Sequence, residues 1–366
     1  MCDVLICFTS GVGNLLDGQV RSRAAPAVRA DHATGSSQAL NGGANVVVRA
    51  DAPTGVTIRP MRTDDLDAAD AVMRQAFGTF FGMPDPADFM GDAGLVRTRW
   101  RADPTSAFVA ELDGALVGSG LANIWGRFGF VGPLTVSPGF WGRGIASRLM
   151  EPILGRFEDR GVAHVGLFTM ANSPQHLHLY QKFDFWPGHL TALLGKPVEA
   201  GARSGGWQRY SVLSAGQRAE SREACRALTD AICPGLDLGD EIDAVAARGL
   251  GETVLLTDDA GVAGFAVCHQ GAGTEAGSDV SYVKFGAAAP GPGASARFDR
   301  LLDACEALAA EAGLKRLSGG ANTGRHAAYR QMLARGFAPE FVGVAMHRRN
   351  APAYNRPDVY VIDDWR

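Results

Sequence analysis

The chain has 366 residues, and this length favours two domains over one. Its formal net charge is −4 and it carries no basic tract, which argues against a nucleic-acid partner. No apolar run approaches the roughly 18 residues of a transmembrane helix, so we expect no membrane partner.

The cysteines show no C-x-x-C spacing, which makes a zinc site improbable and leaves the protein without an expected metal. They are typical of isolated thiols in a reducing cytoplasm, and we therefore expect a cytoplasmic protein. The oligomeric state stays open. The six cysteines are Cys2, Cys7, Cys225, Cys233, Cys268 and Cys305.

The first 54 residues contain few periodic apolar positions and many small polar residues, so we expect residues 1–54 to form a disordered N-terminal extension. Residues 56–60 then predict the first strand. Asp64 and Asp65 are candidate N-cap residues for a helix over residues 66–77, whose apolar positions recur at helical spacing.

Residues 108–118 predict a hairpin, because two apolar runs flank an Asp113-Gly114 turn. An apolar run over residues 131–136 predicts another strand. It leads into a glycine-rich loop, Pro138 to Ala146, and a helix follows. That helix carries one apolar face, formed by Ile145, Leu149, Met150, Ile153, Leu154 and Phe157.

A strand, a glycine loop and a helix start together suit the binding of a pyrophosphate. Glycines let the backbone approach an anion, and the N–H groups of the first helical turn point toward it. Alone, this pattern is also compatible with an ordinary tight turn.

The flanking motifs resemble the GNAT superfamily of acetyl-CoA-dependent N-acetyltransferases, over about residues 56–200. The resemblance rests on four segments: Val136-Ser137-Pro138, the loop Trp141-Gly142-Arg143-Gly144-Ile145-Ala146, Asn172, and Tyr180-Gln181-Lys182-Phe183-Asp184-Phe185. Two positions depart from the family pattern, since Trp141 replaces Gln or Arg and Asp184 replaces Gly. Neither change removes a backbone N–H group.

The resemblance implies acetyl-CoA as co-substrate and assigns a role to each matching position. Tyr180 would be the general acid that protonates the leaving thiolate. The strand residues would pair with the pantetheine arm, the loop would hold the pyrophosphate, and Asn172 would bond the arm or a water. The implied cofactor-binding residues are Leu134, Thr135, Val136, Trp141, Gly142, Arg143, Gly144, Ile145, Ala146 and Asn172.

No carboxylate marks a general base on the strand before the loop, and the remaining candidates are His176, His178 or a water chain. The acceptor would be a small-molecule amine or a peptide amine. Aromatic residues at 77–90 would border its cleft in this fold, or they are ordinary core. The loop 275–279 carries two acids that could face a cationic amine, but we expect a solvated turn there.

The second part of the chain repeats the first. Gly118 matches Gly264 at a shift of 146, and Gly161 and Phe185 match Gly313 and Phe337 at a shift of 152.

At the shift of 152, residues expected to carry chemistry are replaced while residues that shape the fold remain. Tyr180 becomes Met332, and the loop residues Gly142, Gly144 and Ala146 become Ala294, Ala296 and Phe298. The sequence therefore predicts a degenerate copy. A register error is the alternative, because Gly291 and Gly293 remain nearby.

The predicted fold is α/β, with two tandem GNAT-like domains that each form a mixed, mostly antiparallel sheet flanked by helices. The predicted boundaries are 55–200 for the acetyl-CoA-binding domain, 201–206 for a linker, 207–350 for the degenerate copy and 351–366 for a tail. The predicted function is direct acetyl transfer to an amine in a ternary complex. Two alternatives stay open: a non-catalytic acyl-CoA sensor, and chemistry like that of mycothiol synthase, another tandem GNAT enzyme.

Overall fold

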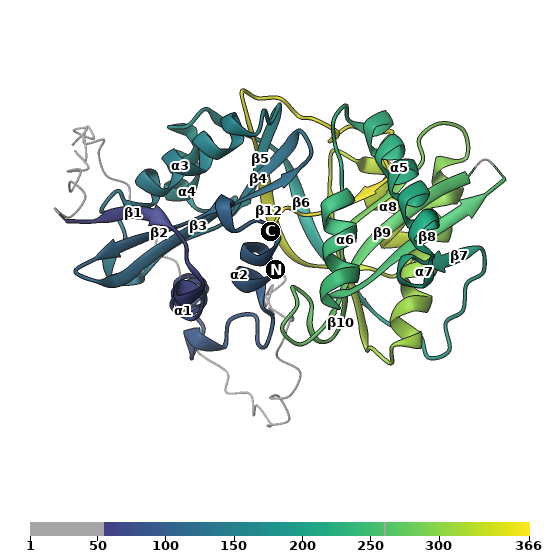
Figure 1. The fold of residues 1–366 in the computed structure, drawn as a ribbon, viewed down its shortest axis with the longest axis horizontal. Coiled ribbons are helices and arrows are strands. Elements are labelled where there is room, and N and C mark those ends of the chain that lie inside the picture. The colour runs from purple at the N-terminus through teal and green to yellow at the C-terminus, as the bar shows by residue number, and fades with distance from the viewer. Residues whose placement is uncertain (1–54, 260) are drawn as a thin grey trace, which may run out of the picture.

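The computed structural model describes residues 55–259 and 261–366, and the expected disordered extension lies outside them. The described strands form one 13-stranded mixed sheet with helices on both faces (Figure 1). The predicted α/β class with a mixed sheet is thereby confirmed. Within the described ranges, no helix is long and apolar enough to cross a membrane.

The first half of the chain contributes six strands and four α-helices, and α1 and α3 lie on opposite faces of its part of the sheet (Figure 1). In chain order these are β1 (Thr57–Pro60), α1 (Leu66–Phe80), α2 (Leu95–Ala102), β2 (Ala107–Leu112), β3 (Ala115–Trp125), β4 (Phe128–Val136), α3 (Ile145–Asp159), β5 (His164–Thr169), α4 (Pro174–Gln181) and β6 (Phe185–Pro197).

The second half contributes seven strands and four α-helices among the described residues. In chain order these are β7 (Trp207–Arg209), α5 (Ala215–Ile232), α6 (Gly239–Arg248), β8 (Gly251–Asp258), β9 (Gly261–Gly271), β10 (Gly277–Ala288), α7 (Ala294–Glu311), β11 (Arg316–Asn322), α8 (His326–Ala334), β12 (Ala338–Arg348) and β13 (Val361–Ile362).

The predicted elements of the first half are present. The Asp113-Gly114 turn joins β2 to β3 with both residues at positive φ, 50° and 78°, as a tight hairpin turn requires. The helix expected over residues 66–77 is α1, and the apolar face predicted for residues 145–157 is the buried face of α3.

Strand β12 crosses from the second half into the first. It pairs antiparallel with β5 on one side, where Val344 lies opposite Thr169, and with β6 on the other. Strand β6 in turn pairs with β11 of the second half, from Thr191↔Asn322 to Pro197↔Arg316. Each half therefore completes the sheet of the other across the predicted linker, and the boundaries at 200 and 207 stay a prediction.

The two halves repeat the same register. The parallel pairs run from Phe128↔His164 to Val131↔Leu167 between β4 and β5, and from Val280↔Arg316 to Val283↔Gly319 between β10 and β11. All four positions are 152 residues apart.

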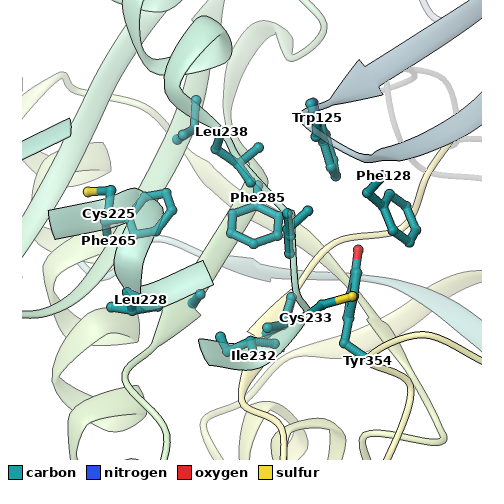
Figure 2. Close-up of a cluster of buried hydrophobic side chains, with 14 of the residues drawn as sticks. Trp125, Phe128, Cys225, Leu228, Ile232, Cys233, Leu238, Phe265, Phe285 and Tyr354 are labelled. Atoms are coloured by element: carbon teal, nitrogen blue, oxygen red, sulfur yellow. The ribbon is translucent and has the colours of Figure 1, made fainter. Parts of the chain in front are cut away.

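An apolar cluster with residues of both halves lies on the face covered by α5 and α6. Trp125 and Phe128 of the first half pack in it with Phe285 and with Tyr354, and the ring centroids of Trp125 and Phe285 are 5.5 Å apart (Figure 2). Much of the segment 351–366, predicted as a tail, is buried in this part of the molecule, including Val361 and Trp365.

Candidate functional site

The strands β4 and β5 separate before β4 ends. Their parallel pairing stops at Val131↔Leu167, whereas β4 continues beside β3 as far as Val136↔Gly118. From Gly132 to Val136, the edge of β4 that faces away from β3 has no strand partner among the described residues. An extended ligand could pair with backbone groups on this open edge, as a peptide does when it adds to a sheet.

The side chains of this segment do not reach solvent freely. Thr135 is buried and its hydroxyl lies 3.1 Å from that of Ser119, while Val136 is buried against α3. Leu134 is half-buried in the same cluster. Their backbone is therefore what the segment offers to a ligand.

The glycine loop lies where β4 ends. Gly142 and Gly144 are exposed and adopt left-handed φ values of 75° and 76°, which favour glycine. A Cβ atom at Gly142 would meet nothing within 4 Å. Gly144 caps α3, whose first-turn N–H groups, beginning at Ile145 and Ala146, have no partner within the helix. The loop and helix start can thus receive an anion.

Two other loop residues are held by local contacts. The indole Nε1 of Trp141 donates to the Val136 carbonyl at 2.6 Å, which ties the loop to the end of β4. The Arg143 guanidinium stacks 5.2 Å from the centre of the Phe140 ring and is exposed. It can add a positive charge beside the helix start.

Tyr180 lies in the last turn of α4, buried, with its ring packed edge-on against Phe185 at 6.3 Å. Burial raises the pKa of its phenol well above the usual range, so the phenol stays protonated at neutral pH. Among the described residues, none hydrogen-bonds to this hydroxyl. The side chain therefore has a proton to donate and no structural partner for it.

Asn172 lies exposed in the turn between β5 and α4. Asp184, which stands where the family has glycine, adopts a left-handed φ of 64°. Aspartate tolerates this conformation better than most residues, so the departure from the family pattern keeps the backbone shape.

His176 lies on α4 and reaches across to α1. It lies one turn before Tyr180 on α4 and therefore on the same face of that helix. Its ring meets Phe80 of α1 edge-on at 5.0 Å, although α1 and α4 lie on opposite faces of the sheet (Figure 1). Burial lowers the pKa of His176, which favours the neutral form. His178 is exposed instead.

An aromatic cluster extends from α1 toward the centre of the sheet. Phe81 stacks with Phe89 at 5.8 Å and meets Phe341 edge-on at 5.7 Å, and Phe341 contacts Phe168 at 5.8 Å. The sequence indicated the residues near α1 but missed Phe168 and Phe341. Phe168 lies on β5 and Phe341 on the exchanged strand β12. No local sequence pattern indicates that these two strands are neighbours.

The prediction of a solvated turn at residues 275–279 is wrong, because Glu275 is buried and strand β10 begins at Gly277. Glu275 is 2% exposed and pairs with Arg99 at 2.9 Å and with Lys284 at 2.8 Å. Asp279 does lie at the surface, paired with Lys315 at 2.9 Å. Glu275 is therefore not available to a cationic amine.

Known proteins resemble this chain in sequence and in fold. The model of the acetyltransferase (GNAT) family matches residues 71–185. An acetyltransferase of Yersinia enterocolitica is 32% identical over 94 residues, which are 26% of this chain and 66% of the relative. An acetyltransferase of Sodalis glossinidius is 31% identical with the same coverage. The matched stretch falls just short of two thirds of either relative.

Two solved structures resemble most of the chain. A protein of Pyrococcus horikoshii has a TM-score of 0.61 at 16% identity and covers 85% of this chain and 95% of its own. A GCN5-related N-acetyltransferase of Sphaerobacter thermophilus has a TM-score of 0.53 at 16% identity, with coverages of 81% and 96%. These likenesses concern the fold. Residues 71–185 therefore resemble the acetyltransferase (GNAT) family in sequence, and most of the chain resembles these two structures in fold.

Proposed function

We propose that this protein transfers acetyl from acetyl-CoA to the nitrogen of an amine, and that the reaction takes place in the first half. The observation that carries the proposal is the open edge of β4 beside an exposed glycine loop at the start of α3. The edge offers backbone groups to the pantetheine arm, and the loop offers N–H groups to the pyrophosphate.

In this proposal the residues of the first half divide the chemistry between them. A backbone N–H on the open edge of β4 polarises the thioester carbonyl. The amine nitrogen forms a bond to the acetyl carbon while the carbon–sulfur bond breaks. Tyr180 gives its proton to the departing thiolate, and the amine loses its proton to His176 or to water.

We further propose that the second half is a degenerate copy without an acetyl-CoA site. Its strand edge is already used, since β13 pairs with β10 at Gly286↔Ile362 and Ala287↔Val361. These β10 positions correspond, at the shift of 152, to Leu134 and Thr135 on the open edge of β4.

The loop that would hold the pyrophosphate is also changed in the second half. Eight residues, 137–144, join β4 to α3, but five, 289–293, join β10 to α7. In the common register α7 therefore begins three residues earlier, and Ala294 and Ala296 lie within it. Gly293, at φ 81°, caps α7 as Gly144 caps α3, so the second half keeps a capping glycine but has a shorter loop. Met332, fully buried, stands in place of Tyr180.

The acceptor is proposed to be a small-molecule amine or a peptide amine with an apolar group beside its nitrogen. The aromatic cluster around Phe81 and Phe341 supports this class, and Phe80, 36% exposed, lies at its margin against His176. Aromatic side chains recognise apolar groups mainly by the area that they bury.

Acetyl-CoA turnover with a panel of amines tests the proposal. The full chain is incubated with acetyl-CoA and aliphatic amines, arylalkyl amines or short peptides, and both free coenzyme A and acetylated amine are measured. We expect amine-dependent release of coenzyme A, greatest for an acceptor with an apolar group. Binding of acetyl-CoA without acetylation of any amine would instead indicate an acyl-CoA sensor.

A further inference from the structure

Both halves carry a β-bulge at the same place in the repeat. In the first half, Gly120 pairs with Leu134 and Ala122 pairs with Val131, so the β3–β4 register shifts at Gly132 and Pro133 of β4. In the second half the β9–β10 register shifts at Lys284, which lies 152 residues after Gly132. Bulges redirect a strand and often lie beside functional sites. Here the first bulge is where β4 leaves β5 and its open edge begins.

The bulge at Gly132 is held by two donors. Arg99 of α2 donates from Nη1 to the Gly132 carbonyl at 2.9 Å, and Asn123 of β3 donates from Nδ2 to the same oxygen at 2.7 Å. Arg99 is almost fully buried, and its guanidinium also lies 5.6 Å from the centre of the Phe130 ring. Its position is therefore fixed on several sides.

The other side of Arg99 is bound to the second half. Its Nη2 donates to Glu275 at 2.9 Å, and Glu275 accepts from the Lys284 ammonium at 2.8 Å. Lys284 also donates to Glu241 at 2.9 Å. All four side chains are at most 8% exposed, and their formal charges cancel. Ion pairs shielded from water in this way are strong only in one geometry.

We propose that Glu275 and Lys284 are positioning residues that act through Arg99. Together they hold the bulge at Gly132 and so fix the beginning of the open edge of β4. This inference rests on the proposed function for its effect on the reaction. It gives the second half a role in the chemistry of the first, because the bulge residue of one half is linked to the bulge of the other.

A purely structural ion pair would affect only stability, so the test needs a readout at β4. Glu275→Gln removes one charge with little change in shape. Its matched control is Glu306→Gln, which breaks the buried pair of 2.7 Å between Lys196 of β6 and Glu306 of α7, away from β4. Both variants should lower the melting temperature. Only Glu275→Gln should speed amide hydrogen exchange in the peptide that contains Leu134 and Val136.

For turnover we expect Glu275→Gln to lower kcat about tenfold or more, since small displacements of a reacting group are costly, and Glu306→Gln to leave it unchanged. The affinity for acetyl-CoA should fall less than kcat does, because the pyrophosphate contacts at Gly142 and Gly144 remain and only the pantetheine contacts on the open edge of β4 are loosened. If Glu275→Gln fails to fold, Arg99→Lys replaces it. Lysine keeps the charge but lacks the planar fork that reaches Glu275 and the Gly132 carbonyl together.

Equal hydrogen exchange at β4 and equal kcat in the Glu275→Gln and Glu306→Gln proteins would overturn the inference. If the parent protein acetylates no amine, the proposed function fails. Hydrogen exchange at β4 still decides whether Glu275 holds the bulge, so the two failures are distinguishable.

Discussion

Ile362 lies opposite Gly286 on β10, and this pairing covers the strand edge that corresponds to the open edge of β4 beside Leu134. The second half therefore fills with its own chain the place that the first half leaves open. We expect one acetyl-CoA to bind per chain, because a second pantetheine arm would have to displace β13. Isothermal titration calorimetry checks this number. Two equivalent sites per chain would contradict the assignment of the second half as silent.

Tyr180→Phe should lower kcat by about 10²- to 10⁴-fold if the phenol is the general acid. Its hydroxyl has no hydrogen-bond partner among the described residues, and Phe keeps the ring packed against Phe185. The melting temperature and the affinity for acetyl-CoA should therefore change little. Steady-state kinetics and thermal unfolding measured on the same preparation check both parts.

The matched control is Tyr210→Phe. The Tyr210 hydroxyl donates to Asp243 at 3.0 Å in the second half, so this variant should lose about 1 kcal/mol of stability and keep its kcat. If Tyr180→Phe instead stays within about threefold of the parent in kcat, Tyr180 is structural and the thiolate leaves without its proton.

The strand exchange predicts that the first half does not fold alone. A fragment of residues 55–206 leaves the edge of β5 without β12 and leaves β6 without both of its neighbours, β11 and β12. We expect it to be unfolded or aggregated, and we expect residues 207–366 to restore a folded complex when both fragments are produced together. Circular dichroism and size-exclusion chromatography measure this. Cooperative unfolding of the isolated, monomeric fragment would disprove the interdependence.

We expect the protein to lose stability at mildly acidic pH because His347 is buried. Burial lowers the pKa of this histidine from 6.5 to about 4, helped by the neighbouring His164 and His189. Because the unfolded chain binds the proton more readily, stability is complete above about pH 6.5 and falls as the pH drops toward 4. The free energy of unfolding lost in this way, once the pH is well below 4, is about 3 kcal/mol.

Urea unfolding at pH 7.5 and pH 4.5 measures this term. Between these two pH values, the free energy of unfolding should fall by about 2 kcal/mol less in His347→Gln than in the parent. The control is His178→Gln on the exposed surface of α4, which should lose as much as the parent. An equal loss in His347→Gln would show that the buried imidazole is not responsible.

The sequence predicted what local patterns determine. The Asp113-Gly114 hairpin, the apolar face of α3 and the glycine loop depend on neighbouring residues, and all three are present. The strand register on both sides of the loop repeats at the shift of 152, whereas the capping glycines Gly144 and Gly293 are 149 positions apart. Such features follow from backbone preference and periodicity, which a single sequence carries.

The sequence did not predict which strands are neighbours. The exchange of β6 and β12 depends on packing between residues more than 100 positions apart. A strand in which apolar and polar residues alternate could pair equally well with a strand of its own half. Glu275 was placed in solvent for the same reason. Its burial is possible because Arg99 and Lys284 neutralise it, and Arg99 is 176 positions away in the chain.

The location of the acetyl-CoA site is the central claim, and a pair of matched substitutions tests it most directly. Gly142 and Gly291 are exposed loop glycines with φ values of 75° and 93°, and an added Cβ meets no atom within 4 Å at either. Glutamate therefore strains both backbones alike and adds the same charge. We expect Gly142→Glu to lose acetyl-CoA binding, because a carboxylate enters the anion site, and Gly291→Glu to bind as the parent does. Calorimetric affinity that is unchanged in Gly142→Glu, or lost in Gly291→Glu, would contradict the account.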